Sequence, residues 1–181
     1  MNILLFNRIM NLLKTIKRAV MLAIIAFLFI LIAVFLFRFF SHREIDDVTP
    51  EIPCLEELFD ESDVLWVVPL FENSIADNSS WCSYIKGLNK TLGLHGVEHR
   101  FNEFETDRSN EYLQRGIDAF ESCFGFKPEM FKPPQLRISE NNKVLIEKMG
   151  LELKGNFNQF MHKVYHCNDT GMFSNKFIGR F

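Results

Sequence analysis

The sequence predicts an α/β domain that follows an N-terminal transmembrane helix. Residues 19–37 contain no charged side chain, and almost all of them are aliphatic or phenylalanine. After residue 43, short β-branched runs alternate with amphipathic segments about five times, which is typical of parallel strands joined by right-handed helical crossovers. An open sheet and a (β/α) barrel both fit this alternation, and 181 residues leave room for one such domain.

The apolar segment is long enough to cross a membrane, since about 20 apolar residues span the hydrocarbon core. We assign residues 19–40 as a transmembrane anchor. A cleaved signal peptide is the alternative, but its apolar region would be shorter, and no small-residue cleavage site follows Phe39-Phe40. Residues 2–13 are too few to span the bilayer and are expected to lie along its surface.

Basic residues flank the anchor unevenly. Residues 1–18 contain four of them and no acid, whereas Arg38 and Arg43 follow the apolar run beside acidic residues. The positive-inside bias therefore places residues 1–18 in the cytoplasm. We expect a single-pass membrane protein whose domain, residues 43–181, lies on the extracytoplasmic side.

Charge and cysteine content restrict the partners of this domain. Residues 1–40 hold five of the 20 basic side chains and none of the 23 acidic ones, so the rest of the chain carries a formal charge of −8. A chain this acidic, without a basic patch, is not expected to bind nucleic acid. Four cysteines follow the anchor and match no zinc-ribbon spacing; buried thiols and one or two disulfides both remain open, and the pairing cannot be deduced. They are Cys54, Cys82, Cys123 and Cys167.

Five strands are expected after the anchor. The clearest covers residues 64–70, a continuous run of β-branched and aromatic side chains that suits a strand covered on both faces. Prolines follow the first strand and interrupt the fourth. They are expected to limit these strands, because proline has no N–H to donate to the hydrogen-bond ladder. The five cover residues 43–47, 64–70, 91–95, 130–134 and 151–153. Residues 160–167 fit either a final strand or a short helix.

Four helices are expected between these strands. The longest covers residues 110–124, where apolar side chains form one stripe and Gly125 provides the stop. Ser79 or Ser80 is expected to cap the helix that precedes residue 91, and Ser139 to cap the one that ends at Gly150. A short helix at residues 54–59 completes the set.

The most informative stretch follows the strand at residues 91–95. His95 ends that strand, Gly96 bends the backbone, and His99 arrives four residues after the first histidine. Two neutral imidazoles at this spacing can converge on one divalent metal if the backbone turns between them. Asp46 and Asp47 end another expected strand, at the edge where parallel folds keep their chemistry. The alternatives are an unliganded pair of histidines and a solvated, helix-capping acidic turn.

These residues resemble the polysaccharide deacetylase superfamily, and most closely its poorly characterised deacetylase-like branch. The resemblance rests on Ile45-Asp46-Asp47-Val48-Thr49-Pro50, then Val68-Pro69, then Leu94-His95-Gly96-Val97-Glu98-His99 with Glu103-Phe104 after it. It covers most of residues 43–155 in the family's order. It implies a distorted (β/α) barrel, which we expect to be incomplete because residues 43–181 are few for this barrel.

The resemblance also implies a metal-dependent hydrolase that removes N- or O-linked acetyl groups from a glycan. A divalent metal, usually zinc, would be held by Asp47, His95 and His99, and Asp46 would be the base that lets a metal-activated water attack the acetyl carbonyl. Lys132, Pro133 and Pro134 stand where the family often has an arginine-containing, groove-lining motif, so Lys132 is the candidate substitute and these three residues the candidate substrate contacts.

Several alternatives stay open at this point. His166 is the candidate general acid, although His162 and His166 could instead share one helix face and bind metal, or lie at the surface. Glu98 and Glu103 are expected to be solvated. A non-catalytic remnant of the fold, which binds glycan or a partner at the membrane, is the alternative to the enzyme. A third possibility is an acidic domain that only assembles with other proteins.

Overall fold

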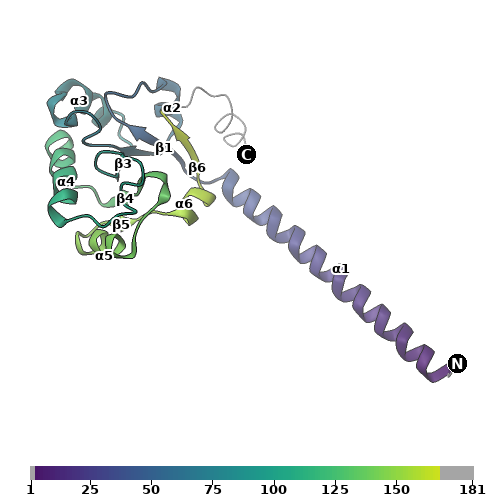
Figure 1. The fold of residues 1–181 in the computed structure, drawn as a ribbon. Coiled ribbons are helices and arrows are strands. Elements are labelled where there is room, and N and C mark those ends of the chain that lie inside the picture. Colours follow the sequence, from purple (N-terminus) through teal and green to yellow (C-terminus); the bar gives the residue numbers. More distant parts are fainter. Residues whose placement is uncertain (1–2, 168–181) are drawn as a thin grey trace. The chain divides into compact units, whose positions relative to one another are not determined.

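The computed structural model describes residues 3–167, with side chains from residue 8 onward (Figure 1). The chain divides after residue 40 into two units. The first is helix α1 (Ile3–Phe39), which runs without a break from the segment expected at the membrane surface into the anchor. Its residues Arg8–Phe39 are long and apolar enough to span a membrane, although a signal sequence would pass the same test.

The second unit is built on a six-stranded parallel sheet with the order β5-β4-β3-β2-β1-β6. The strands are β1 (Arg43–Val48), β2 (Val64–Val67), β3 (Thr91–His95), β4 (Met130–Lys132), β5 (Glu152–Leu153) and β6 (Lys163–His166). Strand β6 returns to pair with β1, so the order is that of a (β/α) barrel in which β5 and β6 do not pair within residues 3–167. The predicted fold class, an incomplete barrel after an apolar helix, is confirmed.

Helices connect the strands in the predicted alternation. In Figure 1, α3, α4 and α5 lie along one side of the strands. The helices are α2 (Glu56–Glu61), α3 (Ser79–Gly87), α4 (Asn110–Phe124), α5 (Glu140–Lys148) and α6 (Asn156–Met161), with short 3-10 turns η1 (Ile75–Asp77) and η2 (Pro134–Leu136). The prediction for α4 was correct to the residue: the Ser109 hydroxyl accepts from the Tyr112 N–H, and Gly125 adopts φ 79° at its end.

The hydrophobic core lies between the sheet and these helices. Alternate strand residues point to opposite faces, so one face of each strand packs against the helices. On this face the residues Ile45, Leu65, Val67, Leu94 and Phe131 are fully buried, and Ile85, Leu113, Phe120 and Ile146 meet them from the helices. Such burial of large apolar side chains is the main stabilising contribution to the domain.

The opposite face of the sheet is polar and equally buried. Trp66 donates its indole N–H to Glu44 at 2.7 Å, and the Lys132 ammonium lies 3.5 Å from Glu44. The indole ring occupies the space beside Gly93, where a Cβ atom would overlap it. Glu44 is 1% exposed and Lys132 is 0% exposed. The interior of the incomplete barrel is therefore a hydrogen-bonded ionic cluster, and not an apolar core.

Residues 160–167, expected to form either a final strand or a short helix, contain the end of α6 and the whole of β6. Asn158 and His162 bond the Glu44 carboxylate from α6 and its C-terminal end. The idea that His162 and His166 share one helix face is wrong, because His162 caps the end of α6, His166 is the last residue of β6, and the two line different cavities. One of these cavities, about 600 Å³, opens at the end of the barrel where the strands begin.

Two disulfides join parts of this unit. Cys54 pairs with Cys167, which ties the end of β6 to the segment before α2, and Cys82 pairs with Cys123, which ties α3 to α4. The alternative of buried free thiols is therefore wrong. Cross-links that close long loops restrict the unfolded chain most.

Several predicted boundaries differ from the observed ones by one or a few residues, and two of the differences have a clear local reason. Helix α3 is capped by the Asn78 side chain, which accepts from the Trp81 N–H at 3.1 Å, and not by Ser79 or Ser80. Strand β2 ends at Val67, because Val68 bonds β1 only with its N–H and Pro69 has none to donate.

Candidate metal centre

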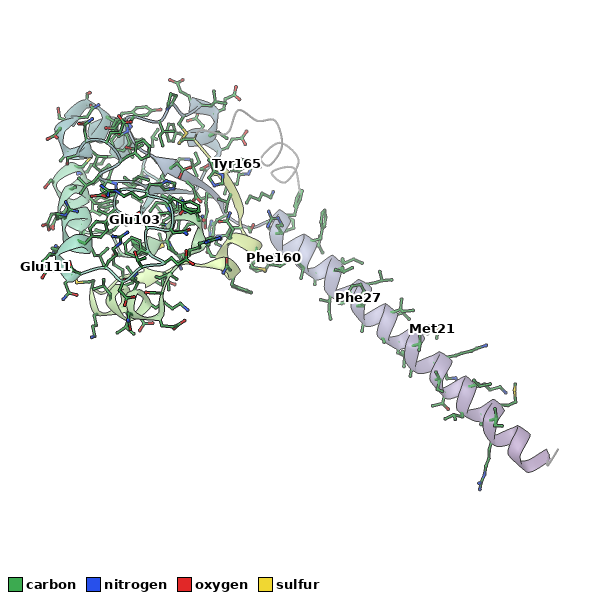
Figure 2. All side chains as sticks on the ribbon, viewed as in Figure 1. Met21, Phe27, Glu103, Glu111, Phe160 and Tyr165 are labelled. Atoms are coloured by element: carbon green, nitrogen blue, oxygen red, sulfur yellow. A yellow bond between two sulfur atoms is a disulfide. The ribbon has the colours of Figure 1, made fainter. Side chains whose placement is uncertain are left out.

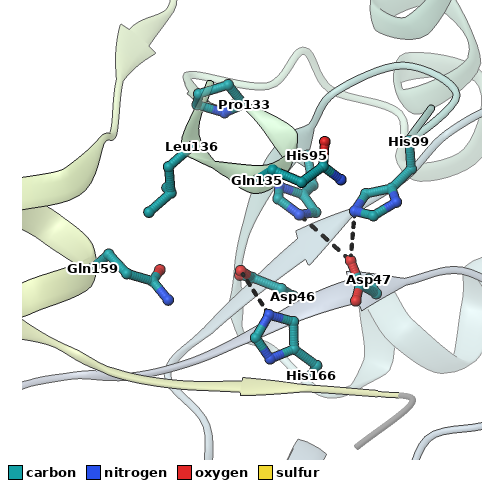
Figure 3. Close-up of a pocket in the computed structure, with 9 residues that line it drawn as sticks. All are labelled: Asp46, Asp47, His95, His99, Pro133, Gln135, Leu136, Gln159 and His166. Atoms are coloured by element: carbon teal, nitrogen blue, oxygen red, sulfur yellow. Dashed lines mark ion pairs between the residues drawn. The ribbon is translucent and has the colours of Figure 1, made fainter. Parts of the chain in front are cut away.

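Three side chains converge at the carboxyl ends of β1 and β3 (Figure 3). Oδ1 of Asp47 lies 2.9 Å from Nε2 of His99 and 3.5 Å from Nε2 of His95. One ligand atom from each residue lies within 4.8 Å of the other two. Ligands about 2.1 Å from a tetrahedral zinc ion would be separated by about 3.4 Å. The arrangement therefore matches the spacing of a three-residue metal site.

A backbone irregularity brings Asp47 to this site. Successive side chains of a regular strand point to opposite faces, so Asp46 and Asp47 should diverge. The register of β1 against β2 shifts between Ile45 and Val48, and Asp47 adopts φ 64°. A bulge of this kind re-aims a side chain. Both carboxylates consequently face the same cavity.

The hydrogen-bond partner of Nδ1 in His95 determines that this nitrogen carries a proton. Nδ1 lies 3.0 Å from the backbone carbonyl oxygen of Lys132, which can only accept a hydrogen bond. We therefore assign a proton to Nδ1, so Nε2 is the nitrogen that faces Asp47 and the one available to a metal. The His95 side chain is 4% exposed, so water does not compete for this orientation.

Charge and burial act in opposite directions on the two groups in closest contact. Burial by itself would raise the pKa of Asp47, but the imidazoles of His95 and His99 outweigh it and hold that pKa well below its usual range. Burial would likewise lower the pKa of His99, yet the adjacent Asp47 carboxylate raises it above its ordinary value. The site thus favours opposite charges in contact.

The donor set fits a divalent cation. Oδ1 of Asp47 is buried and accepts no aligned hydrogen bond, although Nε2 of His99 is only 2.9 Å away. The two atoms are close, but their geometry is not that of a hydrogen bond. This carboxylate oxygen is therefore left without a donor. Two imidazole nitrogens and one carboxylate oxygen are ligands that zinc accepts, and three protein ligands leave a position open.

Asp46 lies beside the three converging side chains. Its Oδ1 accepts from the Lys132 ammonium at 2.7 Å, and its Oδ2 lies 3.8 Å from Nε2 of His166. Asp46 is 3% exposed, whereas the His166 side chain is 42% exposed. The base expected from the sequence is thus held between a buried lysine and a partly solvated histidine.

A cavity of about 230 Å³ opens over these groups (Figure 3). Of the expected substrate contacts, Pro133 lines it, whereas Lys132 and Pro134 do not. Lys132 is fully buried beneath Asp46, so its ammonium contacts the carboxylate and not the open cavity. The lining residues are Asp46, Asp47, His95, His99, Pro133, Gln135, Leu136, Gln159 and His166.

Sequence reasoning missed Gln135, Leu136 and Gln159 in this lining. Gln135 and Leu136 adopt φ 51° and 57° in succession after the two prolines. Non-glycine residues in this left-handed region cost about 1–3 kcal/mol each and cluster at functional sites. No local signal in the sequence predicts such a pair, because neither residue type favours positive φ.

The expectation that Glu103 is solvated is wrong. Glu103 is 0% exposed, and its carboxylate lies beneath the loop that carries His99. The Glu98 side chain is partly buried, 15% exposed, and pairs with Arg100 and Arg115. Glu103 lies in an acidic stretch, residues 102–107, which suggested a solvated loop. The burial of a charged side chain depends on tertiary contacts, and these cannot be read from the sequence.

The fold is the one found in carbohydrate esterase family 4, the polysaccharide deacetylases, as the resemblance implied. A peptidoglycan N-acetylglucosamine deacetylase matches with a TM-score of 0.56 at 14% identity, over 77% of each chain. The wild-type family 4 pseudoenzyme from Bacillus anthracis matches with a TM-score of 0.50 at 11% identity, over 64% of this chain and 48% of the other.

Other matches cover less. A family 4 carbohydrate esterase from Streptomyces lividans, in complex with acetate, has a TM-score of 0.42 at 17% identity and covers 50% of this chain and 46% of its own. The chain spans only 32% to 48% of the length of the pseudoenzyme structures that it matches. Comparison of the sequence with protein-family models and with curated proteins gives no match. The structural matches thus include both an enzyme and a pseudoenzyme.

Proposed function

We propose that this chain is a membrane-anchored, metal-dependent hydrolase that removes N- or O-linked acetyl groups from a glycan. The observation that carries the proposal is the convergence of Asp47, His95 and His99 on one open cavity, beside the carboxylate of Asp46. The two aspartates lie on β1, whereas the two histidines lie at the end of β3 and in the loop after it, so the meeting of these two pairs is not a consequence of sequence proximity.

The chain's own residues supply the proton transfers. A bound divalent metal would supply a Lewis acid that polarises the acetyl carbonyl and makes water acidic near neutral pH. Asp46 accepts the proton of the water that adds to the carbonyl carbon. His166, in its protonated form, donates a proton to the leaving nitrogen or oxygen as the bond to the acetyl carbon breaks. The products are acetate and the free amine or hydroxyl group.

Lys132 supports the base in this scheme. Its ammonium lies 2.7 Å from Asp46 and is fully buried, so solvent screens the pair little. The contact holds the Asp46 carboxylate in a fixed position beside the cavity. Lys132 thus acts on the reaction through Asp46 and does not touch the substrate.

The domain is expected on the extracytoplasmic side of the membrane. The basic residues of segment 1–18 support this orientation through the positive-inside bias. The pairs Cys54–Cys167 and Cys82–Cys123 support it independently, because disulfides persist in oxidising compartments. A glycan of the cell envelope would be within reach there.

The full chain, purified in detergent, tests the proposal. We expect one zinc ion per chain and release of acetate from an N-acetylated oligosaccharide. Asp46→Asn should retain the metal but lose at least about 100-fold in kcat, since a general base contributes that much. His95→Ala should lose both metal and activity. A folded chain that holds metal but releases no acetate from any N- or O-acetylated glycan would contradict the hydrolase.

A non-catalytic, glycan-binding or partner-binding protein is the second candidate. The lysine at position 132 favours it, because the family often has an arginine-containing motif at this place. This protein would bind acetylated oligosaccharide without turnover, and Asp46→Asn would leave the affinity unchanged. Measurement of binding and of acetate on the same sample separates the two candidates.

A further inference from the structure

We propose that Glu103 is a positioning residue that fixes the loop carrying His99 and thereby sets the metal affinity of the centre. This inference rests on the proposed function for its consequence, since it assumes that the centre binds metal. The loop geometry on which it depends is a property of the chain itself. Figure 2 shows Glu103 inside the domain, in contrast to Glu111 at its margin.

The Glu103 carboxylate accepts four hydrogen bonds. Oε1 accepts from the backbone N–H groups of Val97 and Glu98, both at 2.9 Å, and Oε2 accepts from the N–H of His99 at 2.9 Å. The Tyr112 hydroxyl adds a fourth bond to Oε1 at 2.7 Å. Three consecutive backbone donors of the loop between His95 and His99 therefore point at one side chain.

Hydrogen bonds, and not ion pairs, hold this carboxylate in the described part of the chain. Within residues 8–167, no lysine, arginine or histidine nitrogen forms an ion pair with it, and the Arg108 side chain bonds the Glu103 backbone carbonyl oxygen instead. An isolated charge in a dry interior is costly unless hydrogen bonds replace its hydration. The backbone N–H groups of the loop do so, as in an anion-binding nest. The loop and the carboxylate thus stabilise each other.

Gly96 makes this arrangement possible. It adopts φ 66°, and a Cβ atom at this position would lie 2.5 Å from Oε2 of Glu103 and 2.6 Å from Pro134. Any other residue would push the carboxylate away from the loop. The glycine of the His-Gly-x-x-His segment therefore has a second purpose besides the turn, which is to admit the side chain of Glu103.

Tyr112 connects this cluster to the core. Burial, followed by the hydrogen bond and negative charge of Glu103, raises the pKa of the Tyr112 hydroxyl far above its ordinary value, so it remains a donor. Tyr112 lies on α4, and its ring packs against Phe104 with centroids 6.3 Å apart. Glu103 thus links the His99 loop to the longest helix of the domain.

The consequence is pre-organisation of His99. This residue adopts φ 56°, which is uncommon for a side chain of its size. A loop free to leave that conformation would present Nε2 to the metal only part of the time. Partners that orient a metal ligand are typically worth about 10- to 100-fold in affinity. We expect Glu103 to contribute within that range.

Substitution Glu103→Gln in the full chain tests the inference. Glutamine keeps the shape but replaces one acceptor oxygen with a donor that faces the loop. Expected results are zinc affinity reduced about 10- to 100-fold by chelator competition, and faster hydrogen exchange at the amides of residues 97–99 in the metal-free chain. Glu105→Gln is the matched control, since Glu105 is exposed and lies two residues away; both quantities should remain at wild-type values.

Two further comparisons keep the outcomes distinct. Tyr112→Phe removes one of the four hydrogen bonds to Glu103. It should lower the zinc affinity and speed the exchange of the loop amides, but less than Glu103→Gln does. It serves as the test variant if Glu103→Gln fails to fold. Wild-type zinc affinity together with unchanged exchange in Glu103→Gln would overturn the inference. Should the wild-type chain bind no metal, the proposed function fails, whereas the exchange of the metal-free loop still decides the role of Glu103.

Discussion

Asp46 and Asp47 are neighbours in the sequence but contact different partners. Asp46 contacts a buried ammonium, whereas Asp47 contacts two imidazoles. The irregularity in β1 lets both side chains face one cavity, and each keeps its own contacts there. Residue type alone predicted two candidate carboxylates, and the backbone conformation assigns each its contacts.

The raised pKa of His99 predicts how the stability of the metal-free chain depends on pH. A histidine whose folded pKa is raised adds stability below its unfolded pKa, about 6.5, and loses it as the pH rises through the folded pKa. Asp47, whose pKa is depressed, adds stability above about 3.9 and loses it as the pH falls through its folded pKa. The two contributions coincide between about pH 4 and 6.5.

Thermal unfolding of the metal-free chain measures this dependence. The melting temperature at pH 5.5 should exceed that at pH 8.5, and His99→Asn should reduce the difference, since asparagine tolerates the backbone conformation but does not titrate. With zinc present the order should reverse, because metal ligation needs the neutral imidazole. An equal pH difference in the variant would exclude the Asp47–His99 pair as its source.

At the scale of elements, β1, β2 and β4 each have one face toward the apolar core and one face toward the ionic cluster. The apolar face was predictable, because continuous hydrophobic runs such as residues 64–67 indicate strands buried on both sides. The inner cluster of Glu44, Trp66 and Lys132 was not, since these three come from three strands. No pattern in the sequence indicates that charged residues on separate strands will be in contact.

Gly93→Ala tests the packing of the inner face. A Cβ atom there would overlap the Trp66 ring, whose indole is bonded to Glu44, so the ring cannot move freely. We expect a loss of about 1–3 kcal/mol in the free energy of unfolding. Gly87→Ala at the end of α3 is the control, because nothing lies within 4 Å of its added methyl group; it should be neutral or slightly stabilising. Equal stabilities in denaturant titrations would exclude a tight Trp66–Gly93 contact.

At the scale of the whole molecule, the disulfides compensate for the incomplete barrel. Cys54–Cys167 closes a segment of 113 residues and anchors β6, an edge strand, to the rest of the unit. Cys54→Ser with Cys167→Ser should cost about 2–5 kcal/mol in the free energy of unfolding. The shorter pair, Cys82–Cys123, should cost less when removed, because it closes 41 residues. Denaturant unfolding of the two double variants compares them, and the reverse order would contradict a loop-entropy origin.

The orientation of the chain makes a separate prediction. A cysteine introduced at exposed Glu105 should react with a membrane-impermeant maleimide in intact cells, whereas one introduced at Thr15 should react only after lysis. The physical reason is the retention of the basic segment on the cytoplasmic side. Labelling in the opposite order would place the domain in the cytoplasm and remove the support for an envelope glycan as substrate.

The sequence by itself determined the alternation of elements, the apolar helix and the candidate ligands, because these depend on local periodicity and on residue spacing along one chain. Strand β3 and helix α4 matched their predicted residues for this reason. Only the tertiary structure decided that Asp47 turns toward His95 and His99, that Glu103 is buried beneath their loop, and that β6 returns to β1. These three features depend on a bulge, a buried hydrogen-bond network and a long-range strand pairing. The network and the pairing are stabilised by contacts between separate segments of the chain. The bulge requires a backbone conformation that its residue type does not favour.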